Sequence, residues 1–193
     1  AIFQDFAYSD PDSLALILIF KIPVARSRKA SSEKLKNMAA SCNKKILFVC
    51  LGNICRSPTS EVILRHLVKE KGEDEKWEID SAGTGDWHVG KRPDKRTLQT
   101  LKKHGISTEH RARVVTSKDF NKFDIIFAFD ESNIRDLKDI RPKAGKAELK
   151  LFGEWDPEGV TNVEDPYYGD IEGFDVMFEH CFRCCKAFLE HSK

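Results

Sequence analysis

Apolar residues occur along the chain in two patterns, short continuous runs and longer stretches with an apolar residue every three or four positions. The short runs are rich in β-branched and aromatic residues, as in buried strands, whereas the longer stretches have helical periodicity. We predict strands over residues 46–49, 77–81, 123–129 and 146–151. We predict helices from Pro58 to about residue 71, over residues 92–104 and over residues 174–189. Strands that alternate with helices predict an α/β fold with a parallel sheet.

The first strand is followed by the most informative stretch of the sequence. Residues 44–58 read KKILFVCLGNICRSP, and the apolar run at 46–49 shows no alternation with polar residues. Such a run is typical of a central strand covered on both faces. Pro58 favours the first turn of a helix, where its missing N–H has little cost. Cys50 is therefore expected where a buried strand opens into a loop.

The loop over residues 51–57 has the features of an oxyanion site. Its backbone N–H groups can curl inward as a nest, and the next helix directs the positive end of its dipole at the same point. Gly52 is expected to permit the tight curl, and Arg56 offers a planar fork of donors. The predicted phosphate-binding residues are Leu51, Gly52, Asn53, Ile54, Cys55 and Arg56.

Cys50 is the predicted nucleophile of this site. The donors that hold an oxyanion also stabilise a thiolate, and Ser57 can donate a hydrogen bond to the sulfur. The alternative is a structural cysteine at the end of a strand, which is common for a free cysteine. That alternative does not account for the surrounding Gly52, Asn53 and Arg56, so the functional interpretation is favoured.

A second motif, Asp165-Pro166-Tyr167-Tyr168, supplies a candidate acid. Cleavage of a phosphate ester needs a proton for the leaving oxygen. Pro166 keeps Asp165 extended, and the two tyrosines can stack against a flat substrate ring. Asp-Pro is also a common turn opener, and we interpret the other example, Asp156-Pro157, as an ordinary turn.

These two motifs closely resemble those of the low-molecular-weight protein tyrosine phosphatases. The resemblance extends from about residue 42 to the C-terminus. It includes the segments DWHVG at 86–90, HGI at 104–106, HRAR at 110–113, DESN at 130–133 and RCC at 183–185.

The resemblance implies a fold and a reaction. The fold would be a single doubly wound domain with a four-stranded parallel sheet of order 2-1-3-4, helices on both faces and the phosphate loop after the first strand. The reaction would be hydrolysis of phosphotyrosine in proteins, and of small aryl phosphates, through a phosphocysteine. Inorganic phosphate would be the product and an inhibitor. Neither a metal nor another cofactor is expected, since Arg56 and the loop supply the positive field.

The resemblance also assigns roles to individual residues. Cys50, Arg56 and Asp165 would be catalytic. Trp87 would wall the active site together with Tyr167 and Tyr168. His110 would hydrogen-bond Asn53 and hold the loop, with Ser57, Cys55 and Asp130 as further supporting residues; Asp130 also suits the cap of the next helix.

Composition excludes several other classes of protein. The chain has 32 Lys and Arg against 31 Asp and Glu, so its net charge of +1 gives no electrostatic basis for binding nucleic acid. Its six cysteines in 193 residues do not indicate a disulfide framework. Reduced thiols favour a cytoplasmic location.

Residues 1–41 do not follow the pattern of the rest. We predict a poorly ordered extension here and a phosphatase domain over residues 42–193, with Met38 as a plausible native start and residues 1–37 dispensable for activity. The apolar run at 14–20 is shorter than the roughly 20 residues that cross a bilayer, so no stable membrane insertion is expected. A peripheral anchor made of this run and the following basic residues is the alternative.

The remaining cysteines allow two hypotheses. Cys181, Cys184 and Cys185 lie on the last predicted helix, where core packing is favoured over a metal site because no second pair of ligands has zinc-like spacing. Cys55 lies in the same loop as Cys50, so a disulfide between them would protect the nucleophile from irreversible oxidation.

Two other functions compete with the phosphatase. An arsenate reductase on the same scaffold would need a redox cysteine near the third strand, and residues 123–133 contain none. A non-catalytic phosphate-binding module would be expected to lack Cys50, Arg56 or Asp165, whereas all three are present.

Overall fold

The computed structural model describes residues 44–192, which belong to one compact unit, Met38–Lys193. The predicted extension at 1–41 and the proposed start at Met38 lie outside the described residues. Among the residues described, no helix is both long enough and apolar enough to cross a membrane.

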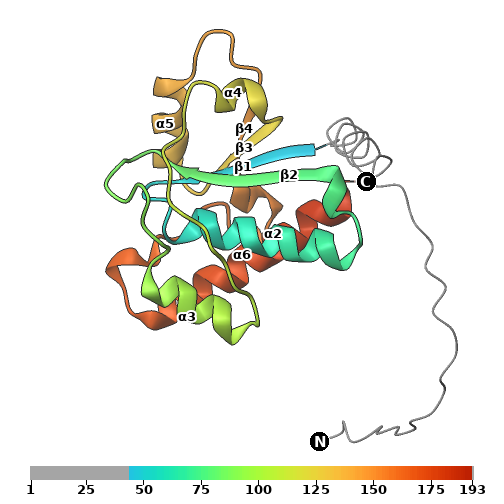
Figure 1. Ribbon diagram of the computed structural model, residues 1–193, viewed down its shortest axis with the longest axis vertical. Helices are drawn as coiled ribbons and strands as arrows, with labels where there is room; N and C mark the ends of the chain where they lie inside the picture. Colours follow the sequence, from blue (N-terminus) through green and yellow to red (C-terminus); the bar gives the residue numbers. More distant parts are fainter. Residues whose placement is uncertain (1–43, 193) are drawn as a thin grey trace, which may run out of the picture. The chain divides into compact units, whose positions relative to one another are not determined.

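Four parallel strands form the sheet, in the order β2-β1-β3-β4 (Figure 1). They are β1 (Lys44–Cys50), β2 (Trp77–Gly83), β3 (Ile125–Ala128) and β4 (Glu148–Leu151). The predicted order is confirmed. Because β1 is central and both of its faces are covered, its apolar run is buried almost completely, which explains the lack of a polar face in its sequence.

Helices cover both faces of the sheet, as expected (Figure 1). On one face lie α2 (Arg56–Glu70), α3 (Lys95–Lys103) and α6 (Ile171–His191). On the other lie α4 (Asp119–Lys122) and α5 (Glu131–Ile140). Three short 3-10 turns, η2 (Asp74–Lys76), η3 (Phe152–Trp155) and η4 (Pro166–Tyr168), join the main elements.

Two hydrophobic cores result, one on each face of the sheet. The larger packs side chains of α2 and α6 against Phe48, Phe127 and Phe152, whose rings contact one another. The smaller packs α4 and α5 against Leu47 and Ile126. Neighbouring residues of β1, such as Leu47 and Phe48, therefore pack into different cores, because successive side chains of a strand point to opposite faces.

Several predicted boundaries differ from the structure. The helix expected over 92–104 begins at Lys95, because Pro93 precedes it and the Asp94 carboxylate caps it by accepting a hydrogen bond from the Arg96 N–H at 2.8 Å. The last helix is longer than expected and starts at Ile171. The short helix α4 and the 3-10 turns were not expected, since segments this short have little periodicity.

Candidate active site

The loop after β1 turns its carbonyl groups outward. The carbonyls of Cys50 and Leu51 accept hydrogen bonds from Thr84 and Gly85, each at 2.9 Å, and that of Ile54 accepts one from the Asp94 N–H at 2.9 Å. None of the hydrogen bonds within residues 44–192 has a backbone N–H of residues 51–55 as its donor. These N–H groups therefore stay available for an anion, as the sequence predicted for a nest.

Asn53, rather than Gly52, adopts the left-handed conformation in this loop. Asn53 has φ 53° and is fully buried, whereas Gly52 is not among the positive-φ residues. The role expected of Gly52, a tight curl without a Cβ clash, does not require a positive φ. Gly52 is needed for space instead, because a Cβ there would lie 3.0 Å from Cδ2 of His88.

Four hydrogen bonds hold the Asn53 side chain in place. Its Nδ2 donates to the hydroxyls of Ser57 and Ser81, both at 2.9 Å. Its Oδ1 accepts from the Arg113 N–H at 2.8 Å and lies 3.1 Å from Nε2 of His110, the expected partner. With every donor and acceptor of the amide used, the left-handed turn is fixed by the surrounding fold.

Glu61 supports this network and was missed by the sequence analysis. Its carboxylate accepts from the Ser81 hydroxyl at 2.7 Å and pairs with Nδ1 of His110 at 3.2 Å. Burial alone would raise the pKa of Glu61, but the hydrogen bonds from His110 and Ser81 outweigh it, and the pKa is lowered. A glutamate near the start of a helix is common, so the position of Glu61 in the sequence does not indicate its supporting role.

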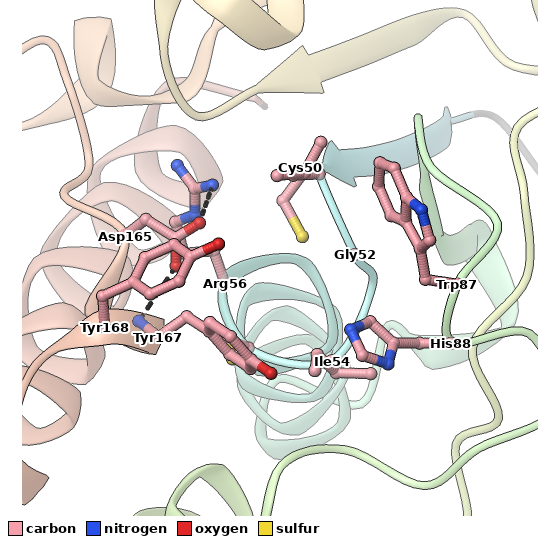
Figure 2. Close-up of a pocket in the computed structure, with 11 residues that line it drawn as sticks. Cys50, Gly52, Ile54, Arg56, Trp87, His88, Asp165, Tyr167 and Tyr168 are labelled. Carbon is pink, nitrogen blue, oxygen red and sulfur yellow. Dashed lines mark hydrogen bonds and ion pairs between the residues drawn. The ribbon is translucent and has the colours of Figure 1, made fainter.

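The Cys50 sulfur lies 3.0 Å from the Ser57 hydroxyl. Cys50 is 3% exposed, and its sulfur points into the pocket shown in Figure 2. A hydroxyl at this distance stabilises a thiolate by donating its proton to the sulfur. The predicted Ser57 contact is present.

Arg56 forms the buried cationic side of the pocket. Its side chain is only 2% exposed, and it forms ion pairs through Nη1 with Asp130 and through Nη2 with Asp165, both at 2.6 Å (Figure 2 shows the second). Burial by itself would lower the pKa of Arg56, but negative charge on Cys50, Asp165 and Asp130 outweighs burial and raises the pKa. Arg56 is thus held cationic and oriented.

One donor of Arg56 has no partner. Only two buried side-chain polar atoms among residues 44–192 lack a hydrogen bond, Nε of Arg56 and Oγ of Ser60. An unsatisfied buried donor is costly, and Arg56 lines the same pocket as Cys50.

Asp165 faces the pocket from the short turn η4. It caps this turn by accepting the Tyr167 N–H at 3.1 Å, and Pro166 occupies the first position of the turn. The Asp165 side chain is 30% exposed, so its carboxylate is accessible from the pocket. The Asp165 carboxylate and the Cys50 sulfur lie on opposite sides of the pocket (Figure 2).

Aromatic residues wall the entrance. Trp87 is 64% exposed and Tyr168 is 90% exposed, and both line the pocket with Tyr167 and Ile54. His88 also lines it, with its ring centroid 6.2 Å from that of Tyr167. The pocket encloses about 260 Å³, and its flat walls fit an aromatic ring. In the sequence, His88 is part of the segment DWHVG at 86–90 and has no role assigned to it.

Asp130 has both of the roles that its sequence position allowed. One oxygen accepts the Asn133 N–H at 2.7 Å and caps α5, while the other pairs with Arg56. The carboxylate follows β3 at the end of the sheet where the pocket lies, which is the usual position of ligand-binding groups in open α/β sheets.

Asp156-Pro157 forms a turn, as expected, with the Gly159 N–H donating to the Asp156 carbonyl at 2.9 Å, but the Asp156 side chain also has a role that the sequence did not indicate. The Asp156 side chain is fully buried, and both its oxygens accept hydrogen bonds from Arg183 at 2.9 Å. His180 pairs with the same carboxylate at 3.2 Å. Nothing in the sequence indicates this ion pair, because Arg183 is far away in the chain and contacts Asp156 only after α6 packs on η3.

Asp156, His180 and Cys184 also lie close enough to be considered as metal ligands. Both oxygens of Asp156 are already paired with Arg183, and Nε2 of His180 lies 3.0 Å from the Val160 carbonyl. A cation would have to displace the Arg183 guanidinium. Burial also raises the pKa of the Cys184 thiol far above its usual range, so the thiolate that a metal requires is disfavoured.

The fold and the site together define a class of protein, the α/β proteins that hold a phosphate group beside a cysteine nucleophile. The family model described as low molecular weight phosphotyrosine protein phosphatase matches residues 45–193. The chain belongs to this family.

Similar proteins with the same description occur in distant organisms. The protein of Sus scrofa is 47% identical over 155 residues, which cover 79% of this chain and 98% of the relative. The protein of Schizosaccharomyces pombe is 52% identical over 150 residues, covering 77% and 96%.

Solved structures of similar fold support the same family. A protein tyrosine phosphatase from Entamoeba histolytica, crystallised with Hepes in the active site, has a TM-score of 0.72 at 36% identity and covers 77% of this chain and 98% of its own. A structure titled drosophila arginine phosphatase has a TM-score of 0.72 at 38% identity, with coverage of 77% and 98%.

Proposed function

We propose that this protein hydrolyses phosphotyrosine in proteins, and small aryl phosphates, through a phosphocysteine intermediate. The observation that carries the proposal is the arrangement around Cys50. The loop after Cys50 has backbone N–H groups that donate no hydrogen bond, Arg56 has a buried Nε without a partner, and both segments line one pocket with Cys50 and Asp165. Family membership supports the same reaction.

The first step transfers the phosphoryl group to the enzyme. The Cys50 thiolate attacks phosphorus in line and forms the S–P bond while the P–O bond to the phenol breaks. Arg56 and the loop N–H groups bind the equatorial oxygens. Asp165 gives its proton to the departing phenolate oxygen, so the phenol leaves neutral and Asp165 becomes a carboxylate.

The second step releases phosphate. Asp165 takes a proton from a water molecule whose oxygen attacks phosphorus, and the S–P bond breaks to return the Cys50 thiolate. Inorganic phosphate occupies the same donors as the substrate, so it should inhibit competitively. The positive charge that the reaction needs comes from Arg56 and the loop, without a metal.

The pocket walls favour an aryl ester. Apolar surface lines the pocket at Trp87, Tyr167 and Ile54. Such walls suit the aromatic ring of a tyrosine side chain whose phosphate reaches the sulfur. Because a structural neighbour is titled an arginine phosphatase, phosphoarginine should be assayed beside phosphotyrosine. We expect the phosphotyrosine peptide to have the higher kcat/KM.

The first experiment measures turnover of 4-nitrophenyl phosphate and a phosphotyrosine peptide in excess chelator. We expect the wild-type chain to be active and Cys50→Ser to be inactive. Asp165→Asn should lose about two to four orders of magnitude in kcat while it still binds phosphate. An inactive wild-type chain that binds phosphate would instead support the phosphate-binding module.

The arsenate reductase has less support than the phosphatase. Such a reaction needs cysteines that can relay a disulfide, and among the described cysteines only Cys55 lines the pocket with Cys50. Cys181, Cys184 and Cys185 are fully buried on α6.

Cys55 is proposed as a redox partner of Cys50. Peroxide would oxidise the Cys50 thiolate to a sulfenic acid, and the Cys55 thiol would displace water to form the disulfide. Burial and the charge on Cys50 raise the pKa of Cys55 far above its usual range, so Cys55 stays protonated and Cys50 is attacked by oxidant first. Mass spectrometry of peroxide-treated protein should find the Cys50–Cys55 linkage; a sulfinic acid at Cys50 without it would contradict the proposal.

We also propose the domain limits and the location. The catalytic domain would span residues 42–193, which is supported by the family match from residue 45. A chain starting at Met38 should keep the kcat and stability of the full chain, and loss of folding would refute this. A cytoplasmic location is supported by the five free cysteines among the described residues, and fluorescence microscopy of the tagged protein tests it.

A further inference from the structure

Arg96 connects the start of α3 to the turn that carries Asp165. Its Nη1 donates to the Gly169 carbonyl at 2.8 Å, and its Nη2 donates to the Tyr167 carbonyl at 3.0 Å. The mechanism described above makes no use of Arg96. Its two contacts fall on the backbone of η4 and of the residue that ends it.

The guanidinium is oriented on its other side by Asp94. One carboxylate oxygen accepts from Nε at 3.0 Å and the other from Nη2 at 3.1 Å. The Arg96 guanidinium also lies 4.4 Å from the ring centroid of Phe174 and 5.8 Å from that of Tyr167. A planar fork with partners on both edges and rings beside it has one preferred orientation.

The same segment contacts the phosphate loop. The Asp94 N–H and the Thr97 hydroxyl both donate to the Ile54 carbonyl, at 2.9 Å and 3.1 Å. Ile54 lines the pocket next to Cys50. The start of α3 therefore contacts both loops of the site. Arg96 makes the contact with the loop over residues 165–169, which we call the acid loop because it carries Asp165.

Tyr167 connects Arg96 to the acid itself. The Tyr167 N–H donates to Oδ1 of Asp165 at 3.1 Å, while the carbonyl of the same residue accepts from Arg96. A movement of this peptide group would move a hydrogen bond of the Asp165 carboxyl. General acid catalysis depends on that carboxyl lying within hydrogen-bond reach of the leaving oxygen.

We propose that Arg96 is a positioning residue for leaving-group protonation, acting through the acid loop to hold Asp165 in line with the Cys50 sulfur. The proposal rests on the proposed phosphatase function. Arg96 would matter most for a substrate whose leaving group needs a proton, and much less for a leaving group that is stable as an anion.

The test compares kcat/KM for phenyl phosphate, a poor leaving group, with kcat/KM for 4-nitrophenyl phosphate, a good one. For Arg96→Gln we expect about a tenfold greater loss on phenyl phosphate than on 4-nitrophenyl phosphate, since a small misplacement of a catalytic group has effects of this order or larger. The inhibition constant of inorganic phosphate should change less than about twofold, because the phosphate loop keeps its own contacts.

Two further variants separate positioning from general destabilisation. Arg92→Gln is the matched control, since Arg92 lies on the same segment but contacts Thr108 and Glu109 instead; it should behave as wild type on both substrates. In an Asp165→Asn background, Arg96→Gln should cause no further selective loss on phenyl phosphate, because the group it positions is already gone.

Each outcome decides the proposal. An equal loss on both substrates, or a selective loss that persists with Asp165→Asn, would overturn it. If Arg96→Gln does not fold, Arg96→Lys keeps the charge but cannot reach Asp94 and both carbonyls at once, and it should show the same selectivity in smaller degree. If the wild-type chain cleaves neither substrate, the phosphatase function fails and this proposal fails with it.

Discussion

At the scale of single residues, the site depends on a few side chains with every hydrogen-bonding group in use. Asn53 combines an unfavourable backbone conformation with four side-chain hydrogen bonds. Arg56 is the opposite case, because its buried Nε has no hydrogen-bond partner within residues 44–192. The loop is thus held in place at Asn53, whereas Arg56 keeps one donor without a partner.

A pair of substitutions at Asn53 separates its backbone role from its side-chain role. Asn53→Gly should lower stability because buried partners lose their hydrogen bonds, at about 1 to 3 kcal/mol each. Asn53→Ala should be less stable than Asn53→Gly by about 1 kcal/mol, since alanine also has to adopt the left-handed conformation. Urea unfolding of both variants measures the difference, and an alanine variant as stable as the glycine variant would contradict the backbone argument.

At the scale of elements, buried charge joins segments that are distant in sequence. Asp156, just after η3, pairs with Arg183 on α6. The hydrogen bonds from Arg183 lower the pKa of Asp156 despite its burial. This pair fixes the start of the segment that leads to Val163, whose carbonyl accepts from Arg56 at 3.2 Å, and to Asp165.

Asp156→Asn should therefore destabilise the protein at neutral pH by about 2 to 3 kcal/mol, because the partly buried Arg183 guanidinium loses its buried charge partner and keeps only the exposed Glu158. A depressed folded-state pKa gives stability that is present above the unfolded value of about 3.9 and lost as pH falls through the folded value. The difference in the free energy of unfolding between wild type and Asp156→Asn should thus be complete at pH 7 and become smaller below about pH 4.

Denaturant unfolding across this pH range measures the effect. Glu158→Gln is the control, since Glu158 contacts the same guanidinium at 3.1 Å with a largely exposed side chain; its effect should stay below about 1 kcal/mol. A pH-independent difference for Asp156→Asn would show that the ion pair is not the cause.

At the scale of the whole molecule, the larger core contains several thiols. Cys55, Cys181, Cys184 and Cys185 are all buried in it. Burial raises the pKa of each thiol, that of Cys181 to about 12. The folded protein therefore keeps these protons at a pH where the unfolded chain has lost them.

Stability should consequently fall in alkali. A raised folded-state pKa gives stability that is full below the unfolded value, about 8.5, and lost as pH rises above it. Each such thiol should contribute a slope of about −1.4 kcal/mol per pH unit above that value. Cys185→Ala should make the fall less steep by this amount between pH 9 and 10.5, whereas an unchanged slope would mean that Cys185 is not protonated in the folded protein.

The sequence by itself determined the chain order of the four strands and of the long helices α2, α3 and α6, and it indicated the residues proposed for the chemistry. Cys50 and Arg56 could be proposed because the phosphate loop is a local structure, made by a strand, a curl and a helix start that follow one another in the chain. Asp165 could be proposed from a separate short motif, Asp165-Pro166-Tyr167-Tyr168. The central position of β1 could also be predicted, since a strand covered on both faces lacks polar alternation.

Tertiary structure alone decided what holds the site. Arg96 contacts the Tyr167 and Gly169 carbonyls, Glu61 contacts His110, and Asp156 contacts Arg183 only after distant elements pack. Single polar residues have no periodicity that would indicate such contacts. The same holds for Asn53, whose left-handed backbone is imposed by Ser81, His110 and Arg113 from other parts of the chain. Local sequence thus sets the reactive groups, whereas their orientation depends on long-range hydrogen bonds that exist only in the folded chain.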